Sequence, residues 1–124
     1  MFLDSELWNL VDLAGVRGMA SGLQVVIRAD WIDRTDQQPQ GLDYAIILQD
    51  EHGNRILGFD NSHAYDGASE NDPWDHEHKV GRTGQRFRYD FKSASQLITD
   101  FFERLEAYCQ SKGISSDFSL EDDL

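Results

Sequence analysis

Residues 42–59 decide the fold and read LDYAIILQDEHGNRILGF. Apolar and polar residues alternate over residues 42–49, which is the period of a strand with one buried face. Turn-forming residues follow at 51–54, and residues 55–59 return as a second strand. Residues 22–31 alternate in the same way. We therefore expect three consecutive strands in an antiparallel meander.

Two further elements extend this meander. Residues 86–91 read RFRYDF, and their strict alternation predicts a last strand with Phe87, Tyr89 and Phe91 facing the core. Residues 93–111 carry an apolar stripe at helical spacing, begin at a capping box and end before a glycine. The predicted fold class is therefore α+β, with a mostly antiparallel sheet of about four strands and a long C-terminal helix packed on one face.

The composition predicts one folded domain, residues 1–124. Hydrophobic residues make up 40% of the 124 residues and aromatic residues 11%, which is enough for a single packed core. The first thirteen residues fit a short amphipathic helix, and residues 114–124 are expected to form an acidic, mobile tail. No apolar run is long enough to cross a bilayer, no signal-peptide pattern is present, and the single Cys109 cannot form an internal disulfide. These features predict a cytoplasmic protein that does not associate with membranes.

The net charge of −12 is unevenly distributed along the chain. Residues 79–92 contain five basic residues and a single acidic one, so the rest of the chain is strongly acidic. An overall field of this sign repels nucleic acid and favours basic partners, whereas a local basic strip is able to bind phosphate. The predicted substrate-binding residues are those of the strip, Lys79, Arg82, Arg86 and Arg88.

Residues 60–85 form a long polar segment that is expected to be a histidine-bearing loop. It holds three of the four histidines, His63, His76 and His78, together with many carboxylates. Histidine transfers protons near neutral pH and is the commonest metal-binding side chain. Cleavage of a phosphodiester through its own 2′-hydroxyl needs a base, an acid and a cation, which the histidines and the neighbouring basic residues supply.

Three interpretations of this segment stay open. It is a solvated acidic surface, a catalytic site, or a metal site that uses His63, His76 and His78 with Asp60 or Asp75. The spacing fixes neither the number of ligands nor their geometry, so we assign no metal and no cofactor. The fourth histidine, His52, lies in the tight turn and is expected to be only a turn residue.

Four segments resemble the TumE-type toxin family of prokaryotic type II toxin–antitoxin systems. They are RILGFDNSH at residues 55–63, HEHK at 76–79, FRYDF at 87–91 and SQLITDF at 95–101. The resemblance extends over most of the chain, residues 22–109, and its most specific part is DNSH followed by HEH. It implies a toxin that acts on RNA and is neutralised by a small DNA-binding antitoxin. By position, the catalytic residues that it implies are Asp60, Asn61, His63, His76 and His78.

The leading hypothesis is therefore an RNA-cleaving toxin that uses the loop histidines. The alternatives are a metal-binding module and a non-catalytic acidic binding protein, either an antitoxin-binding module or a nucleic-acid-mimicking inhibitor. A homodimer also stays open. The leading hypothesis makes a geometric prediction: Asp60 and Asn61 should end one strand and Arg86 should begin the next. Both ends of the loop would then meet at one sheet edge, where His63 approaches the other two histidines.

Overall fold

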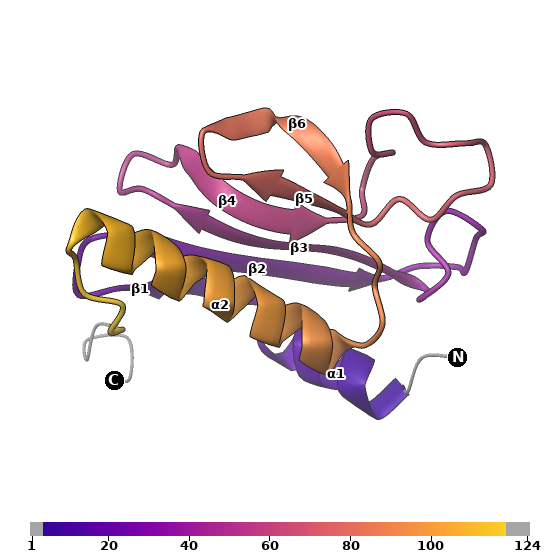
Figure 1. The fold of residues 1–124 in the computed structure, drawn as a ribbon. Coiled ribbons are helices and arrows are strands. Elements are labelled where there is room, and N and C mark those ends of the chain that lie inside the picture. The colour runs from indigo at the N-terminus through magenta and orange to yellow at the C-terminus, as the bar shows by residue number, and fades with distance from the viewer. Residues whose placement is uncertain (1–3, 119–124) are drawn as a thin grey trace.

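The chain folds as an α+β structure with one six-stranded sheet (Figure 1). The computed structural model describes residues 4–118. All neighbouring strands are antiparallel and follow one another in chain order from β1 to β6. The elements are α1 (Asp4–Asp12), β1 (Gly15–Gly18), β2 (Gln24–Trp31), β3 (Leu42–Gln49), β4 (Arg55–Asp60), β5 (His76–Lys79), β6 (Arg82–Arg88) and α2 (Ala94–Lys112).

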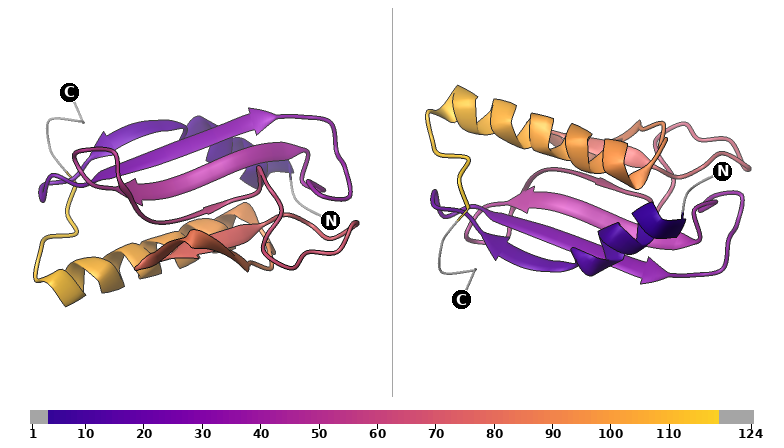
Figure 2. Two further views of the ribbon diagram at one scale, coloured as in Figure 1. Left: turned by 90° about the horizontal axis from the view of Figure 1, so that it is seen from above. Right: turned by 90° about the horizontal axis from the view of Figure 1, so that it is seen from below.

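The core lies between one face of the sheet and α2. Figure 1 shows α2 crossing this face, with α1 beside its N-terminal end. The alternation predicted for β3 is confirmed, because its inward-facing residues Leu42, Tyr44, Ile46 and Leu48 are fully buried. The apolar stripe of α2 is buried against them and consists of Ala94, Leu97, Phe101, Leu105 and Cys109. The views from above and below show that the sheet is twisted and that β6 curls toward the side of α2 (Figure 2).

Both predicted ends of α2 are confirmed by local hydrogen bonds. The Ser93 hydroxyl accepts a hydrogen bond from the backbone N–H of Gln96 at 3.0 Å, which satisfies an N–H group that the helix leaves free. At the other end, Gly113 has a φ of 66°, a left-handed conformation that favours glycine. These caps fix where α2 starts and ends on the sheet.

The sheet has six strands where the sequence predicted about four. The first strand that the prediction missed is β1, whose two glycines were interpreted only as breaks after the first helix. The second is β5, inside the segment expected to be a loop over residues 60–85. In addition, β6 begins at Arg82, not at Arg86. The irregular segment is therefore residues 61–75, and its two ends lie on the adjacent strands β4 and β5.

The prediction of three core-facing aromatic residues near β6 is correct for two of them. Tyr89 and Phe91 follow the end of the strand and pack against the core. Their rings lie 4.8 Å from Phe59 and 5.8 Å from Tyr44 respectively. Phe87 is half-buried and lies under the ammonium group of Lys79, outside the core cluster of the described residues. A strand at the sheet edge buries this side chain less than the regular alternation suggested.

The two ends of the chain are described in part. Leu3 of the predicted first helix and residues 119–124 of the predicted tail lie outside the described residues. Phe118 forms a β-bridge with Met19, and the backbone N–H of Ala20 donates to the carbonyl oxygen of Asp117. The start of the tail therefore lies against the sheet near β1. Among residues 4–118, no helix is both long enough and apolar enough to cross a membrane.

Candidate functional site

Strands β4 and β5 place Asp60, His76 and His78 on the sheet face opposite α2, called the outer face. In the antiparallel register, Asp60 is the partner of His76, and Gly58 is the partner of His78. Because successive side chains of a strand point to opposite faces, Phe59 enters the core while Asp60 points outward. The H-x-H spacing on an extended strand likewise directs both imidazoles to the same face.

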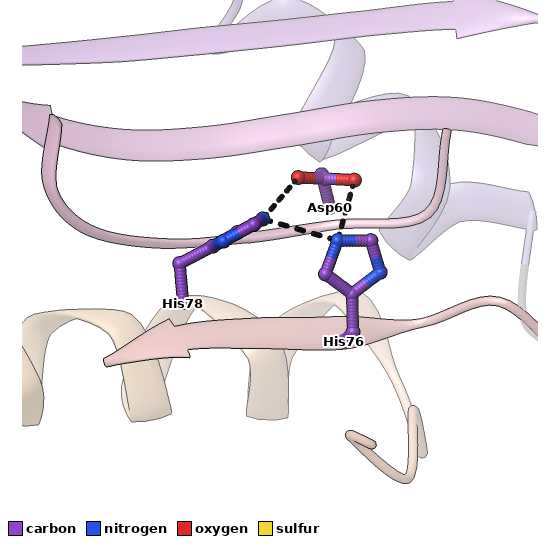
Figure 3. A group of neighbouring side chains, drawn as sticks. All are labelled: Asp60, His76 and His78. Carbon is purple, nitrogen blue, oxygen red and sulfur yellow. Dashed lines mark hydrogen bonds and ion pairs between the residues drawn. The ribbon is translucent and has the colours of Figure 1, made fainter. Parts of the chain in front are cut away.

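The three side chains point toward one another (Figure 3). His76 Nε2 lies 3.0 Å from Asp60 Oδ1, and His78 Nε2 lies 3.2 Å from Asp60 Oδ2. The two Nε2 atoms are 3.1 Å apart. Within the described part of the chain, this is the only group of at least three histidine, cysteine or acidic side chains whose ligand atoms converge closely enough to hold a metal ion.

The backbone holds Nδ1 of each imidazole, the ring nitrogen that does not face Asp60. His76 Nδ1 lies 2.7 Å from the carbonyl oxygen of Trp74, and His78 Nδ1 lies 2.7 Å from that of Thr83. A carbonyl oxygen only accepts hydrogen bonds, so both Nδ1 atoms carry their proton and donate it. Both rings therefore turn Nε2 toward the Asp60 carboxylate.

The centre is buried and charged. His76 is 0% exposed, His78 is 5% exposed and Asp60 is 7% exposed. Burial by itself would raise the pKa of the Asp60 carboxyl, but the hydrogen bonds to His76 and His78 hold this pKa well below its ordinary value. The backbone N–H of Ser62 adds another bond to the carboxylate. Asp60 is thus ionised at neutral pH in spite of its burial.

The segment after β4 covers the centre on the outer face. The Ser62 hydroxyl donates to Asp43 on β3 at 2.6 Å. Four residues later, Asp66 forms two hydrogen bonds with the backbone of Arg86 on β6. The chain between these contacts spans the width of β4 and β5, which explains why the histidines are buried although their face of the sheet carries no helix.

Asp60 also lines a cavity of about 230 Å³ that opens on the outer face. The cavity is lined by Arg28, Ala45, Ile47, Arg55, Asp60, Ser62 and His63. His63 is exposed at this cavity and does not belong to the converging group. Asp60 therefore connects the buried histidine pair to a surface that a ligand can reach.

Comparison with known proteins identifies the family. The family model described as Toxin TumE matches residues 18–109, which include the complete site. The chain belongs to the TumE toxin family. No curated protein and no solved structure matches it. The match of the family model confirms the resemblance found from the sequence segments. In the TumE toxin the matched range extends from the end of β1 to Cys109 in α2.

Asn61 of this TumE toxin points away from the cavity and into the fold. Its side chain is fully buried, accepts a hydrogen bond from the Tyr44 backbone N–H and donates one to the Leu42 carbonyl oxygen. It also donates to Gln40. These bonds tie the end of β4 to the start of β3, so the structure gives Asn61 contacts that position its neighbour Asp60.

Asp75 belongs to the same buried network as Asn61. Its Oδ2 accepts hydrogen bonds from the Gln40 amide and the Tyr44 hydroxyl, both at 2.7 Å. Burial raises the pKa of the Asp75 carboxyl to about 6. Its Oδ1 is the one buried side-chain oxygen or nitrogen of residues 4–118 that has no hydrogen-bond partner. Asp75 does not join the converging group of Asp60, His76 and His78, so the structure does not place it among the candidate metal ligands.

The predicted basic strip does not gather at the outer-face cavity. Lys79 lines a separate cavity of about 460 Å³ beside α2, next to Glu77 and Arg104. Arg86 donates to the Ala64 carbonyl oxygen, and Arg88 pairs with Asp90. Arg82 is exposed at the start of β6.

The basic residues of the cavity are instead Arg28 and Arg55, which sequence reasoning did not select. Arg28 is paired with Asp30 and Asp43 and donates to the Ser62 hydroxyl, whereas Arg55 is exposed. The signal for Arg28 was present in the sequence. It lies at an outward position of the alternating segment 24–31, whose inward residues Val25, Ile27 and Ala29 are buried. Strict alternation from Phe59 and Leu57 would turn Arg55 toward the core. A register shift between β3 and β4 pairs Arg55 with Gln49 and turns it to the outer face.

Proposed function

We propose that this TumE toxin cleaves RNA at the outer-face cavity. The observation that carries the proposal is the convergence of Asp60, His76 and His78 beneath a cavity that His63 and two arginines line. Cleavage through the 2′-hydroxyl needs a group that accepts a proton, one that donates a proton and positive charge for the phosphate. The cavity offers all three kinds of group on one exposed surface.

Each side chain has a role that its environment supports. Arg28 and Arg55 would contact the phosphate, because arginine matches the geometry of phosphate oxygens. His63 would transfer a proton, since it is the exposed histidine of the cavity and histidine is a common acid–base side chain in catalysis. The Asp60 carboxylate, which the buried histidines hold in the same lining, would accept the proton of the 2′-hydroxyl, while His63 would donate a proton to the leaving oxygen.

The family implies an antitoxin partner. We propose that this partner is a small DNA-binding protein encoded beside the toxin. A net charge of −12 supports a basic partner, because opposite charges steer association and hold the complex in register.

The test is expression of the toxin without its antitoxin. The wild-type toxin is expected to arrest growth, and the purified protein to cleave RNA. His63→Ala should reduce cleavage by roughly 10²–10⁴-fold, the usual contribution of a general acid or base. The matched control is His52→Ala, because His52 is exposed in the β3–β4 turn, away from the cavity.

Undiminished RNA cleavage by the His63→Ala toxin would remove His63 from the mechanism. Growth arrest without any RNA cleavage, unchanged by His63→Ala, would favour the non-catalytic binding protein instead. Because His63 is exposed, its replacement is expected to leave the melting temperature unchanged, so loss of activity cannot be ascribed to unfolding.

A further inference from the structure

We propose that Asp60, His76 and His78 bind one transition-metal ion of the zinc type. The inference deepens the proposed function, and only the ion's place in RNA cleavage rests on that function. Ion binding itself rests on the geometry of the three side chains and on the backbone that holds them.

Lone pairs crowd together inside the cluster. Both Nδ1 protons are donated to carbonyl oxygens, so a neutral His76 and a neutral His78 each present a bare Nε2. These two nitrogens lie 3.1 Å apart and face an ionised carboxylate at 3.0 and 3.2 Å. Electron-rich atoms repel one another at such distances unless a proton, as in a hydrogen bond, or a metal ion lies between them. A metal ion satisfies all of them together.

The spacing of the ligand atoms is close to that of a zinc site. Zinc binds imidazole nitrogen and carboxylate oxygen at about 2.0–2.2 Å with tetrahedral geometry, which places neighbouring ligand atoms about 3.3 Å apart. The three closest separations in this cluster are 3.0, 3.1 and 3.2 Å. The ligand atoms therefore need to move apart by only a few tenths of an ångström to admit the ion.

The groups around the ligands also match those of a metal site. Histidines that bind metal almost always donate their other N–H to a carbonyl oxygen or a carboxylate, which fixes the ring and its tautomer. His76 and His78 both do so, and Asp60 is held by the Ser62 backbone N–H as well. A metal-binding histidine needs this hydrogen bond from its second ring nitrogen, whereas a surface histidine does not.

The types of ligand favour one kind of ion, and their number leaves one coordination position open. Two imidazoles favour zinc or a similar transition metal over magnesium or calcium, which prefer oxygen ligands. Three protein ligands leave a fourth position, as in zinc sites that act on substrates. Asp60 lines the outer-face cavity, so this open position would face the side where His63 and the arginines lie.

The experiment is a titration of the untagged full-length toxin, freed of metal, with Co²⁺ followed by Zn²⁺. We expect one Co²⁺ per chain, with the visible absorption of a four-coordinate site, and its displacement by one equivalent of Zn²⁺. Zinc should also raise the melting temperature, because an ion that binds only the folded state stabilises that state. Absence of stoichiometric binding would overturn the proposal and leave a shared proton as the occupant.

Two variants test the assignment of ligands. His78→Gln and Asp60→Asn should each weaken Co²⁺ binding by at least 100-fold, whereas His52→Ala should bind as wild type does. Two measurements establish whether each variant is folded. They are circular dichroism and the rate of Cys109 alkylation, which is slow only while the thiol is buried. If both folded variants retain wild-type affinity, the ion lies elsewhere and the assignment is wrong.

The outcomes separate this proposal from the proposed function. Stoichiometric Co²⁺ binding by a toxin that cleaves no RNA would support the metal site and contradict the RNA-cleaving function. RNA cleavage at full rate by protein that binds neither Co²⁺ nor Zn²⁺ would overturn the metal site and leave the function standing.

Discussion

Asp60 is an acidic residue whose burial is balanced by its two histidine partners. An unpaired carboxylate with so little exposure would be protonated, because burial disfavours the charged form. Here both carboxylate oxygens lie within 3.2 Å of an imidazole nitrogen. The positions of Asp60 on β4 and of His76 and His78 on β5 therefore keep the Asp60 carboxyl ionised at the floor of the cavity.

At the same scale, Arg55 and Arg82 provide a direct test of where RNA binds. Arg55 lines the outer-face cavity, whereas Arg82 lies at the start of β6, outside its lining. In the His63→Ala background, which keeps RNA intact, Arg55→Ala should weaken RNA binding and lower the salt dependence of log K by about 0.7–1. Arg82→Ala should change neither quantity. The measurement is a salt series of binding isotherms with a single-stranded RNA.

If Arg82→Ala weakens RNA binding and Arg55→Ala does not, RNA binds the basic strip, residues 79–92, that the sequence alone suggested. Equal, small effects from both would indicate that neither arginine contacts the phosphates.

Sequence reasoning selected the residues of the centre but not the partners of each one. Asp60, His76 and His78 could be selected because histidine and aspartate carry recognisable chemistry. The histidine partners of the Asp60 carboxylate depend on the register of β4 with β5, and the covering segment depends on contacts from Ser62 to Asp66. No local pattern encodes such distant pairings. The family resemblance implied Asn61 at the site, and its place in the buried network likewise depends on partners far along the chain.

At the scale of elements, β5 is the strand that makes the site, and its sequence does not look like one. HEHK contains no apolar residue, yet three of its four residues are buried. Its backbone pairs with β4 on one edge and β6 on the other. Glu77 pairs with Arg104 of α2 at 2.9 Å, and the two histidines meet Asp60. A strand prediction based on apolar alternation misses it because polar partners, not apolar packing, satisfy its side chains.

The elements whose packing is apolar were predicted correctly for the same reason. The meander of β2, β3 and β4 and the helix α2 bury residues at periods of two and 3.6, and these periods are visible in the sequence. The short edge strand β1 contains two glycines among four residues, so it has no such period.

The packing of α2 makes a prediction about Cys109, the only cysteine of the chain. Its side chain is buried on the sheet side of the helix, and burial raises the pKa of the thiol. Since the thiolate is the reactive form, native toxin should react with a thiol reagent far more slowly than a peptide cysteine at the same pH. Denaturant should restore the full rate. The measurement is the time course of alkylation by mass spectrometry with and without urea.

Rapid alkylation of the native protein would contradict the packing of the C-terminal half of α2. A Ser111→Cys variant supplies the matched control, because Ser111 is exposed in the last turn of the same helix and its thiol should react at once.

At the scale of the whole molecule, the fold separates two kinds of surface. One face of the sheet is covered by α2 and forms the apolar core, whereas the outer face carries the charged centre and its cavity. The strongly acidic character of the rest of the chain disfavours unspecific binding of nucleic acid. RNA would therefore be held through local contacts in the cavity and not by the overall field.

The most direct test of the role proposed for Asp60 in RNA cleavage is the integrity of transcripts after expression of the Asp60→Asn toxin. This substitution keeps the shape of the side chain and removes its charge. Transcript 5′ ends are mapped after induction of the wild type, of Asp60→Asn and of the control Asp12→Asn, an exposed carboxylate at the end of α1, on the α2 side of the sheet. This role of Asp60 predicts new 5′ ends and growth arrest for the wild type and Asp12→Asn, and neither for a folded Asp60→Asn toxin. An Asp60→Asn toxin that cuts the same transcripts at the wild-type rate would contradict it.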